Sequence, residues 1–282
     1  MRSKMTTLLL LCLLLSLSGC NYNNQTVNNK NVIEETPSEF AETLTLEEVE
    51  DVLTTSGIQL SSCSNDSLPV FNDVEPAAFN IAGSDDILLI YVFNSIAERL
   101  EAMGDFTHEK QQDLFGQFSL IHKAKNTAII HIINAAPDKY DDFIEASQRI
   151  GPIQKTVWEK LNELEKLTFT GAGEFWEARY VVEYYSHRYK TLNNSANYDH
   201  WSETRFSLRP KFEVPNDLEI SYTYGTTSSS GSGKTTIRGN EFHKLGGSGG
   251  NGSIPLETFV YTVTVEWEGQ KEVFEMTNIA EN

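Results

Sequence analysis

The feature that most constrains this chain is a leucine run near its N-terminus, because it removes a segment from the folded protein. Residues 8–15 are all leucine except Cys12, and Arg2 and Lys4 precede them with no acidic residue. A positive start followed by a short apolar core is typical of a secretory signal peptide, and this core is too short to span a bilayer as a mature helix. The alternative is an uncleaved N-terminal anchor helix, and the residues that end the run decide against it.

The run ends in Leu17-Ser18-Gly19-Cys20, which resembles the lipobox of bacterial lipoproteins. Small residues at 18 and 19 let a peptidase approach the backbone closely. The resemblance implies that the Cys20 thiol carries diacylglycerol and that the chain is cut between Gly19 and Cys20. Two acyl chains hold a protein firmly at a membrane, since each buried methylene contributes about 0.8 kcal/mol. We therefore expect a signal peptide over 1–19 and a mature protein that is lipid-anchored at the extracytoplasmic face of the cell membrane.

The acidic composition limits the partners. The formal charge is −18, and loss of Arg2 and Lys4 with the signal leaves 20 basic residues against 40 acidic ones, a charge of −20. Such a charge disfavours nucleic acid and anionic lipid head groups as partners. We interpret the acidic surface as one that favours solubility rather than as a site for a cationic ligand.

Three cysteines suggest redox or metal chemistry until they are placed in the chain. Cys12 lies in the signal, and Cys20 is the lipid acceptor. Cys63 is left without a cysteine partner, so it forms neither an internal disulfide nor a cysteine metal cluster. We interpret it as a residue of a loop or strand end.

The length suggests about two folded domains after the signal. Residues 20–43 are polar and rich in asparagine, which predicts a disordered tether that follows the lipidated cysteine. Residues 44–165 predict an α+β domain. Residues 166–282 predict an all-β domain. The expected fold class is therefore α+β, with an N-terminal α+β domain followed by an antiparallel β-sandwich of the immunoglobulin-like kind.

The elements expected in 44–165 follow from caps and apolar patterns. Thr45 and Glu48 have the spacing of a capping box, and Ser95 and Glu98 repeat it. The run 87–93 is apolar on both faces, which is typical of a central strand that is covered on both sides. We expect helices that begin near 44 and 95 and over 108–122, and strands at 58–60, 79–81, 87–93 and 128–133. A helical pattern over 139–167 is interrupted at Gly151-Pro152, which predicts two helices, with Pro152 near the start of the second, or one kinked helix.

The remainder alternates with the period of strands. Residues 174–189 and 259–267 place apolar side chains on one face and polar ones on the other, and Glu268-Gly269 predicts a hairpin into 271–276. Residues 201–208 and 218–224 are also strand-like. The glycine- and serine-rich segments 225–233 and 246–253 predict loops.

Several motifs suggest chemistry that we reject on the sequence. Residues 231–236 (Gly-Ser-Gly-Lys-Thr-Thr) resemble part of a P-loop, but Ser228 stands where a glycine is required, so we expect no nucleotide. None of the six histidines has the spacing of a helical zinc site. His131, within an apolar strand, is expected to be structural. Asp199, His200, Trp201 and His187 could cluster in space, although no spacing requires it.

Carboxylates beside aromatic residues are the last candidates. Glu174 and Glu177 flank Trp176, as in a glycosidase site, but an alternating strand with solvated charges explains them as well. We therefore assign no catalytic residue, metal ligand or cofactor. The aromatic residues Phe175, Tyr185 and Tyr189 are expected on an outer face or strand end, where they bind a glycan or a partner, or pack beneath a loop.

The whole order of segments carries a second resemblance. The lipobox, the polar tether and residues 88–99, 125–133 and 265–272 together resemble uncharacterised surface lipoproteins of Bacillus and related Firmicutes. The resemblance implies no activity for particular residues. We expect a non-enzymatic envelope protein that binds another envelope protein or a glycan. The alternative is an extracytoplasmic hydrolase of a cell-wall component, and a transporter's substrate receptor fits less well because the second half is all-β.

Overall fold

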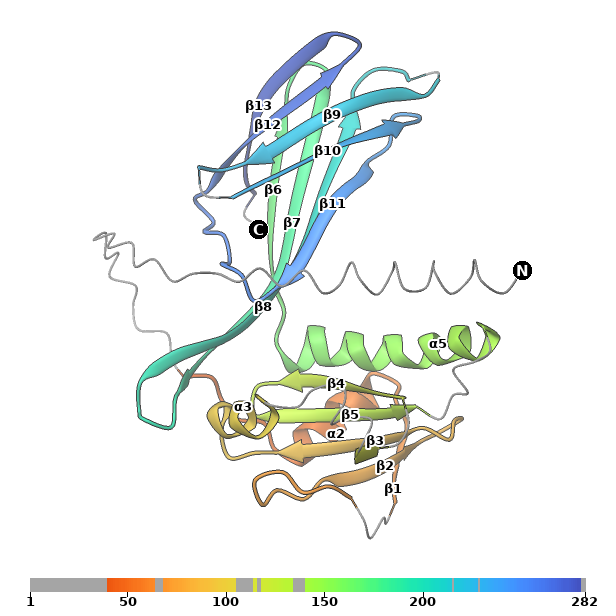
Figure 1. The fold of residues 1–282 in the computed structure, drawn as a ribbon, viewed down its shortest axis with the longest axis vertical. Helices are drawn as coiled ribbons and strands as arrows, with labels where there is room; N and C mark the ends of the chain where they lie inside the picture. The colour runs from red at the N-terminus through yellow and green to blue at the C-terminus, as the bar shows by residue number, and fades with distance from the viewer. Residues whose placement is uncertain are drawn as a thin grey trace, which may run out of the picture. The chain divides into compact units, whose positions relative to one another are not determined.

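The computed structural model describes residues 40–63, 68–104, 114–115, 118–133, 140–214, 216–227 and 229–279. Gly19, Cys20 and nearly all of the predicted tether lie outside the described residues. The described part belongs to one compact unit, Glu39–Asn282, and is mostly antiparallel β-structure (Figure 1). Its named strands form a five-stranded and an eight-stranded sheet.

The five-stranded sheet has the order β1-β2-β3-β5-β4, and every neighbouring pair is antiparallel. Its strands are β1 (Leu60–Ser62), β2 (Ala77–Ile81), β3 (Ile87–Val92), β4 (Phe118–Ala124) and β5 (Thr127–Ile133). The helices of this part are α2 (Leu46–Thr55), α3 (Ile96–Gly104), α5 (Tyr140–Thr156) and the π-helix η1 (Val157–Leu161).

Both faces of this sheet are covered, as the apolar run 87–93 predicted. Leu88 and Ile90 pack in one core with α2, α5 and η1. Leu89 and Tyr91 point the other way, into a core with Met103 of α3. The alternation of β3 therefore supplies two apolar layers, and the helices are held by burial on opposite faces.

The first predicted capping box is confirmed, and the second is modified. Thr45 Oγ1 accepts from the Glu48 amide at 3.3 Å, and the Glu48 carboxylate accepts from the Thr45 amide at 2.7 Å. At α3, Ser95 Oγ accepts from the Glu98 amide at 3.1 Å, but the Glu98 carboxylate accepts from Asn94 instead. Both helices thus begin where their first-turn amides find side-chain acceptors.

Two helix predictions in this part were wrong at their ends. A helix was expected over 108–122, but residues 118–122 belong to β4, which pairs with β5; 105–113, 116 and 117 lie outside the described residues. Two separate helices, one of the two arrangements expected at Gly151-Pro152, do not form, because α5 continues through Pro152. The helix instead loosens into η1, and β6 begins at Glu165. Tertiary pairing and burial of Ile153, Val157 and Leu161 outweigh the local signal of proline.

The eight-stranded sheet has the order β10-β9-β12-β13-β6-β7-β8-β11. Its strands are β6 (Glu165–Ala172), β7 (Trp176–Lys190), β8 (Ala196–Pro210), β9 (Leu218–Gly225), β10 (Ser230–Ile237), β11 (His243–Gly250), β12 (Val260–Trp267) and β13 (Gln270–Asn278). The predicted hairpin at Glu268-Gly269 is confirmed, with positive φ at both turn residues (46° and 74°).

The predicted immunoglobulin-like sandwich of two sheets is not confirmed. All eight strands are joined by hydrogen bonds into one sheet, because β6 pairs with β13 on one side and β7 on the other. The sheet curls so that Tyr222 of β9 donates to the carbonyl of Leu245 on β11 at 2.7 Å. Its concave face encloses one apolar core, in which the Phe206 and Tyr224 rings stack at 3.9 Å.

The two predicted glycine–serine loops are confirmed in part: residues 226, 227, 229 and 251–253 lie outside strands, whereas residues 230–233 belong to β10 and residues 246–250 belong to β11. A side chain at Gly231 would lie 2.5 Å from the Tyr224 ring, and one at Gly233 would lie 2.5 Å from the Tyr222 hydroxyl. Glycine is therefore required for the tyrosines of β9 to lie over β10. The tyrosine rings supply the packing that a glycine strand lacks, an effect known as aromatic rescue.

Candidate functional site

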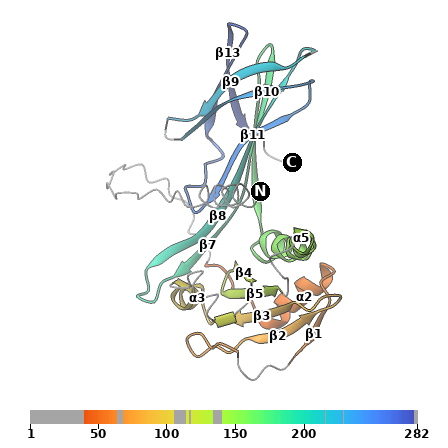
Figure 2. The same cartoon turned by 45° about the vertical axis from the view of Figure 1, so that its right-hand side comes forward.

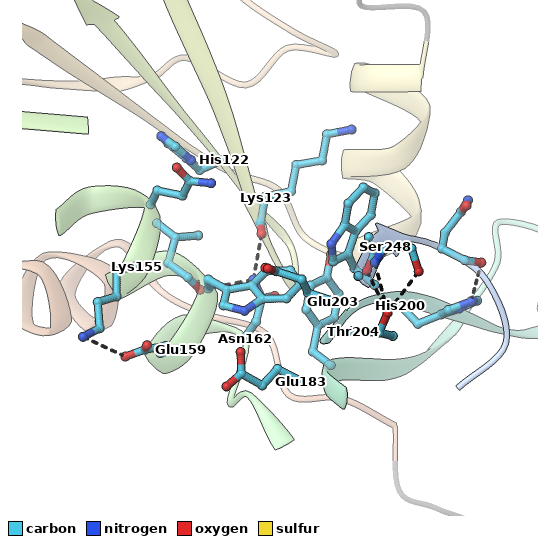
Figure 3. Close-up of a pocket in the computed structure, with 18 of the residues that line it drawn as sticks. His122, Lys123, Lys155, Glu159, Asn162, Glu183, His200, Glu203, Thr204 and Ser248 are labelled. Carbon is cyan, nitrogen blue, oxygen red and sulfur yellow. Dashed lines mark hydrogen bonds and ion pairs between the residues drawn. The ribbon is translucent and has the colours of Figure 1, made fainter. Parts of the chain in front are cut away.

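The candidate site is a cleft between the long β7–β8 hairpin and the helices α5 and η1, which cover one face of the five-stranded sheet. Figures 1 and 2 show this hairpin reaching from the larger sheet to α3. The cleft has a volume of about 1420 Å³. Most of its lining side chains belong to β4, α5, η1, β7, β8 and β11, and they are spread within the ranges 121–123, 151–162, 183–205 and 244–251 (Figure 3).

The alternation of β7 and β8 places different residues on the cleft and in the core. Val182 and Phe206 belong to the core of the curled sheet. On the opposite face, Glu183 is opposite Glu203 and Tyr185 is opposite Trp201 in the strand register. The hairpin is therefore amphipathic: one face is apolar and packs in the core, and the other face is aromatic and charged and lines the cleft.

Three aromatic rings form the centre of the cleft wall. Trp158 of η1 meets Tyr185 edge-on at a centroid distance of 5.4 Å, and it meets Trp201 at 6.5 Å with an interplanar angle of 87°. Tyr185 is buried, whereas Trp201 is 41% exposed. Edge-to-face pairs fix ring orientation, so the cluster presents a rigid aromatic surface. Tyr189 and exposed Tyr198 extend it along the hairpin.

Charged and hydroxyl groups surround these rings. Glu183 is paired with Arg205, and Lys155 Nζ lies 3.9 Å from a Glu159 carboxylate oxygen. The described lining contains four acidic side chains (Glu159, Glu183, Asp199 and Glu203) and four Lys or Arg side chains (Lys123, Lys155, Arg205 and Lys244). The cleft is therefore balanced in charge, although the chain as a whole carries −18. This balance suits a neutral polar ligand.

The hairpin is held against the first sheet by buried polar contacts. Arg99 of α3 is fully buried and forms an ion pair with Asp199 of β8. Asn162 donates to the Lys123 carbonyl at 2.9 Å, and its side-chain oxygen lies 3.2 Å from Nε2 of His187. These contacts tie α3, β4 and η1 to the hairpin.

Burial changes the ionisation of groups in this region. Burial lowers the pKa of His187 to about 4, so its ring is neutral near neutral pH and Nε2 donates to Asn162. Burial also lowers the pKa of His122 to about 4. Burial, with the Asp199 carboxylate, raises the pKa of Tyr185 to about 12. Each shift follows from desolvation of the charged form, so all three side chains are neutral near pH 7; His122 Nε2 is buried without a hydrogen-bond partner among the described residues.

The structure shows where the other candidate site residues from the sequence lie. His187, Asp199, His200 and Trp201 do lie together: His187 is opposite Asp199, and the other two line the cleft. Tyr185 and Tyr189 also line it, but Phe175 does not and packs on Trp267 at 5.7 Å.

The glycosidase-like group is structural. Trp176 is fully buried, Glu177 pairs with Arg209, and Glu174 contributes its backbone amide to a bond with Glu272. The P-loop-like segment lies in strand β10, which has no helix after it to hold phosphate.

His131 is buried, as predicted. Its Nε2 lies 3.0 Å from the buried Asp86 carboxylate, which also accepts from Arg149 at 2.8 Å. Burial outweighs this partner and lowers the pKa of His131. Cys63 follows β1 with a free thiol, so its prediction as a strand-end residue is confirmed. Among the described residues no group of three or more His, Cys, Asp or Glu is arranged to hold a metal ion.

Sequence patterns did not indicate five of the residues that complete the cleft, namely Trp158, Glu183, Glu203, Thr204 and Ser248. Thr204 and Ser248 hydroxyls lie 3.0 Å apart across β8 and β11, and β11 had been predicted as a loop. Alternation on β7 could have indicated Glu183, but no local pattern marks Trp158.

Comparison of the chain with protein-family models, with curated proteins and with solved structures finds no match. Within the described ranges, the structure contains no helix that meets the length and hydropathy needed to cross a membrane.

Proposed function

We propose that this protein is a lipid-anchored, extracytoplasmic binding protein of a bacterial envelope and that its cleft binds a glycan without chemical turnover. The observation that carries the proposal is the cluster of Trp158, Tyr185 and Trp201, with hydroxyl and charged groups around it. Sugar rings have apolar C–H faces that stack on aromatic side chains, and their hydroxyls need a polar surround. The balanced charge of the lining fits a neutral sugar better than an ionic ligand.

The proposed anchor is the diacylglyceryl group on Cys20. It rests on the leucine run, the two small residues before the cysteine and the resemblance to Firmicutes surface lipoproteins. The cleft then lies outside the cytoplasm, where cell-wall glycans are present.

Replacing Cys20 with Ala is expected to abolish both the addition of diacylglycerol and the cleavage before residue 20. The substitution removes the thiol that carries both acyl chains. The measurement is mass spectrometry of the N-terminal peptide of the protein expressed in a Gram-positive host. Cys63→Ala is the matched control and should leave the lipid mass and the N-terminus unchanged. A Cys20→Ala protein that is cut at the same bond, or an unsubstituted protein whose N-terminal peptide carries no acyl mass, would contradict the anchor.

Replacing Trp201 with Ala is expected to weaken glycan binding by at least about tenfold, the equivalent of about 1.4 kcal/mol, since it removes an exposed stacking face. The measurement is isothermal titration with oligomers of N-acetylglucosamine and with soluble peptidoglycan fragments.

Phe175→Ala is the control for this titration. Phe175 has a similar exposure, 38%, and also touches another aromatic ring, but it lies outside the cleft. Equal affinity of the Trp201→Ala and unsubstituted proteins, or binding of neither probe, would contradict the glycan site.

The alternative is hydrolysis of a cell-wall component, and one observation favours it. Glu183 and Glu203 face each other across β7 and β8 in the cleft, and glycosidases use paired carboxylates. The ion pair of Glu183 with Arg205 stabilises a carboxylate, which opposes a role as general acid. Release of reducing ends that is lost in Glu203→Gln, with binding retained, would establish the alternative.

A further inference from the structure

The end of the β7–β8 hairpin differs in charge from the rest of the chain. Between Glu183 and Asp199 the sequence holds Arg188 and Lys190 and no acidic residue, although 40 of 282 residues are acidic. β7 ends at Lys190, and the turn to β8 closes with a bond from the Thr191 amide to the Ser195 carbonyl at 2.8 Å. We call residues 186–198 the hairpin tip.

The hairpin tip also exposes apolar and aromatic side chains. Leu192 in the turn is 61% exposed and Tyr198 is 48% exposed. Tyrosine and basic side chains are typical of membrane–water interfaces, because they place an apolar body against acyl chains and a polar end among head groups. Leu192 at the turn, together with Arg188 and Lys190 at the end of β7, gives the same arrangement.

The N-terminal side of the folded unit reaches the same hairpin tip. The Ala41 amide donates to the Arg188 carbonyl at 2.9 Å. The Phe40 ring lies 4.8 Å from the Arg188 guanidinium and 5.0 Å from Lys190 Nζ. The chain from Cys20 to Phe40 extends at most about 70 Å when fully stretched. The segment that leads to the proposed anchor therefore joins the folded unit beside the hairpin tip.

We infer that the hairpin tip is a second membrane contact, which binds the surface of an anionic phospholipid bilayer. The inference rests on the proposed anchor. The anchor gives the hairpin tip a high effective concentration at the membrane surface, so that even a weak contact is populated. The net negative charge does not prevent it, since charges farther than about 8 Å from the surface are screened at physiological salt. Near the tip, Asp199 is neutralised by Arg99, and the acidic residues closest in sequence to Phe40 are Glu39 and Glu42.

The test places a tryptophan at the turn. The full lipidated protein with Leu192→Trp is reconstituted through its own acyl chains into vesicles of equal parts phosphatidylglycerol and phosphatidylcholine, with bromine on the acyl chains of some lipid. Subtracting the emission of the unsubstituted protein separates the emission of residue 192 from that of the four native tryptophans. We expect quenching of roughly one half or more of its emission, since an interfacial side chain contacts the acyl bromines. The quenching should fall in about 1 M salt, where the screening length is near 3 Å.

Two control variants define the outcome. Arg188→Glu with Lys190→Glu should abolish the quenching while the protein still floats with the vesicles. Gln270→Trp, at the exposed β12–β13 turn, should stay unquenched. The inference is overturned if Leu192→Trp is quenched no more than Gln270→Trp, or if quenching is equal on phosphatidylcholine alone and insensitive to salt. If the unsubstituted protein does not float, the anchor is absent and the inference fails with it; glycan titration in solution is unaffected by either result.

Discussion

Replacing Asp199 with Asn is expected to lower the free energy of unfolding by about 3–5 kcal/mol, because it leaves a buried guanidinium without a counter-charge. Arg99 is fully buried, and its Nε and Nη1 have no hydrogen-bond partner, so Asp199 is the carboxylate that compensates it. The pair joins α3 to β8, and Asp199 is one of the residues that line the cleft. Loss of the charge on Asp199 should therefore loosen the hairpin as well as the core.

The measurement is chemical denaturation of the single and double variants. Arg99→Met combined with Asp199→Asn removes both charges and should recover most of the lost stability, since an apolar replacement of a buried pair is often neutral. Asp217→Asn is the matched control. It breaks the ion pair between Asp217 and Arg238, whose side chains are 54% and 80% exposed respectively. It should therefore change the free energy of unfolding little. A loss for Asp199→Asn no larger than that for Asp217→Asn would contradict the prediction.

Local patterns predicted those elements whose stability is set by neighbouring residues. The capping box of Thr45 and Glu48 fixed the start of α2, and the alternation of β7 and β12 identified strands with one buried face. The turn at Glu268-Gly269 predicted its hairpin because Gly269 adopts without steric cost the positive φ that a two-residue turn requires. In each case the deciding contacts lie within a few residues.

Elements whose conformation is decided by the side chains or pairing of another strand could not be predicted in the same way. β10 is a strand because tyrosines of β9 pack over Gly231 and Gly233, which no pattern within β10 shows. β4 is a strand because β5 pairs with it along its length. The cleft is the extreme case: Trp158 and Trp201 are 43 positions apart in the sequence, and their contact depends on where the hairpin reaches the helical layer.

Replacing Gly171 with Ala is expected to destabilise the protein by about 3 kcal/mol or more, because the new methyl group collides with backbone rather than with a movable side chain. A Cβ at Gly171 would lie 1.9 Å from the carbonyl oxygen of Glu275 on β13. β13 and β6 share only the register pairs Thr277 with Thr170 and Asn278 with Phe169. Gly171 therefore lies beside the short junction through which the eight strands become one sheet.

Gly151→Ala separates this steric effect from the general effect of removing glycine. Gly151 lies in α5, and a Cβ there would meet no atom within 4 Å outside its chain neighbours and its own helix backbone. Alanine in a helix interior is favoured over glycine by about 0.8–1.0 kcal/mol, and crowding of its Cβ by the following Pro152 reduces that gain, so this variant should be no less stable than the unsubstituted protein. A large downward shift of the denaturation midpoint for Gly171→Ala, with no downward shift for Gly151→Ala, is the expected result. If Gly171→Ala left the midpoint unchanged, β6 would not approach β13 as closely as the junction requires, and the single curled sheet would be wrong at the point that joins its two halves.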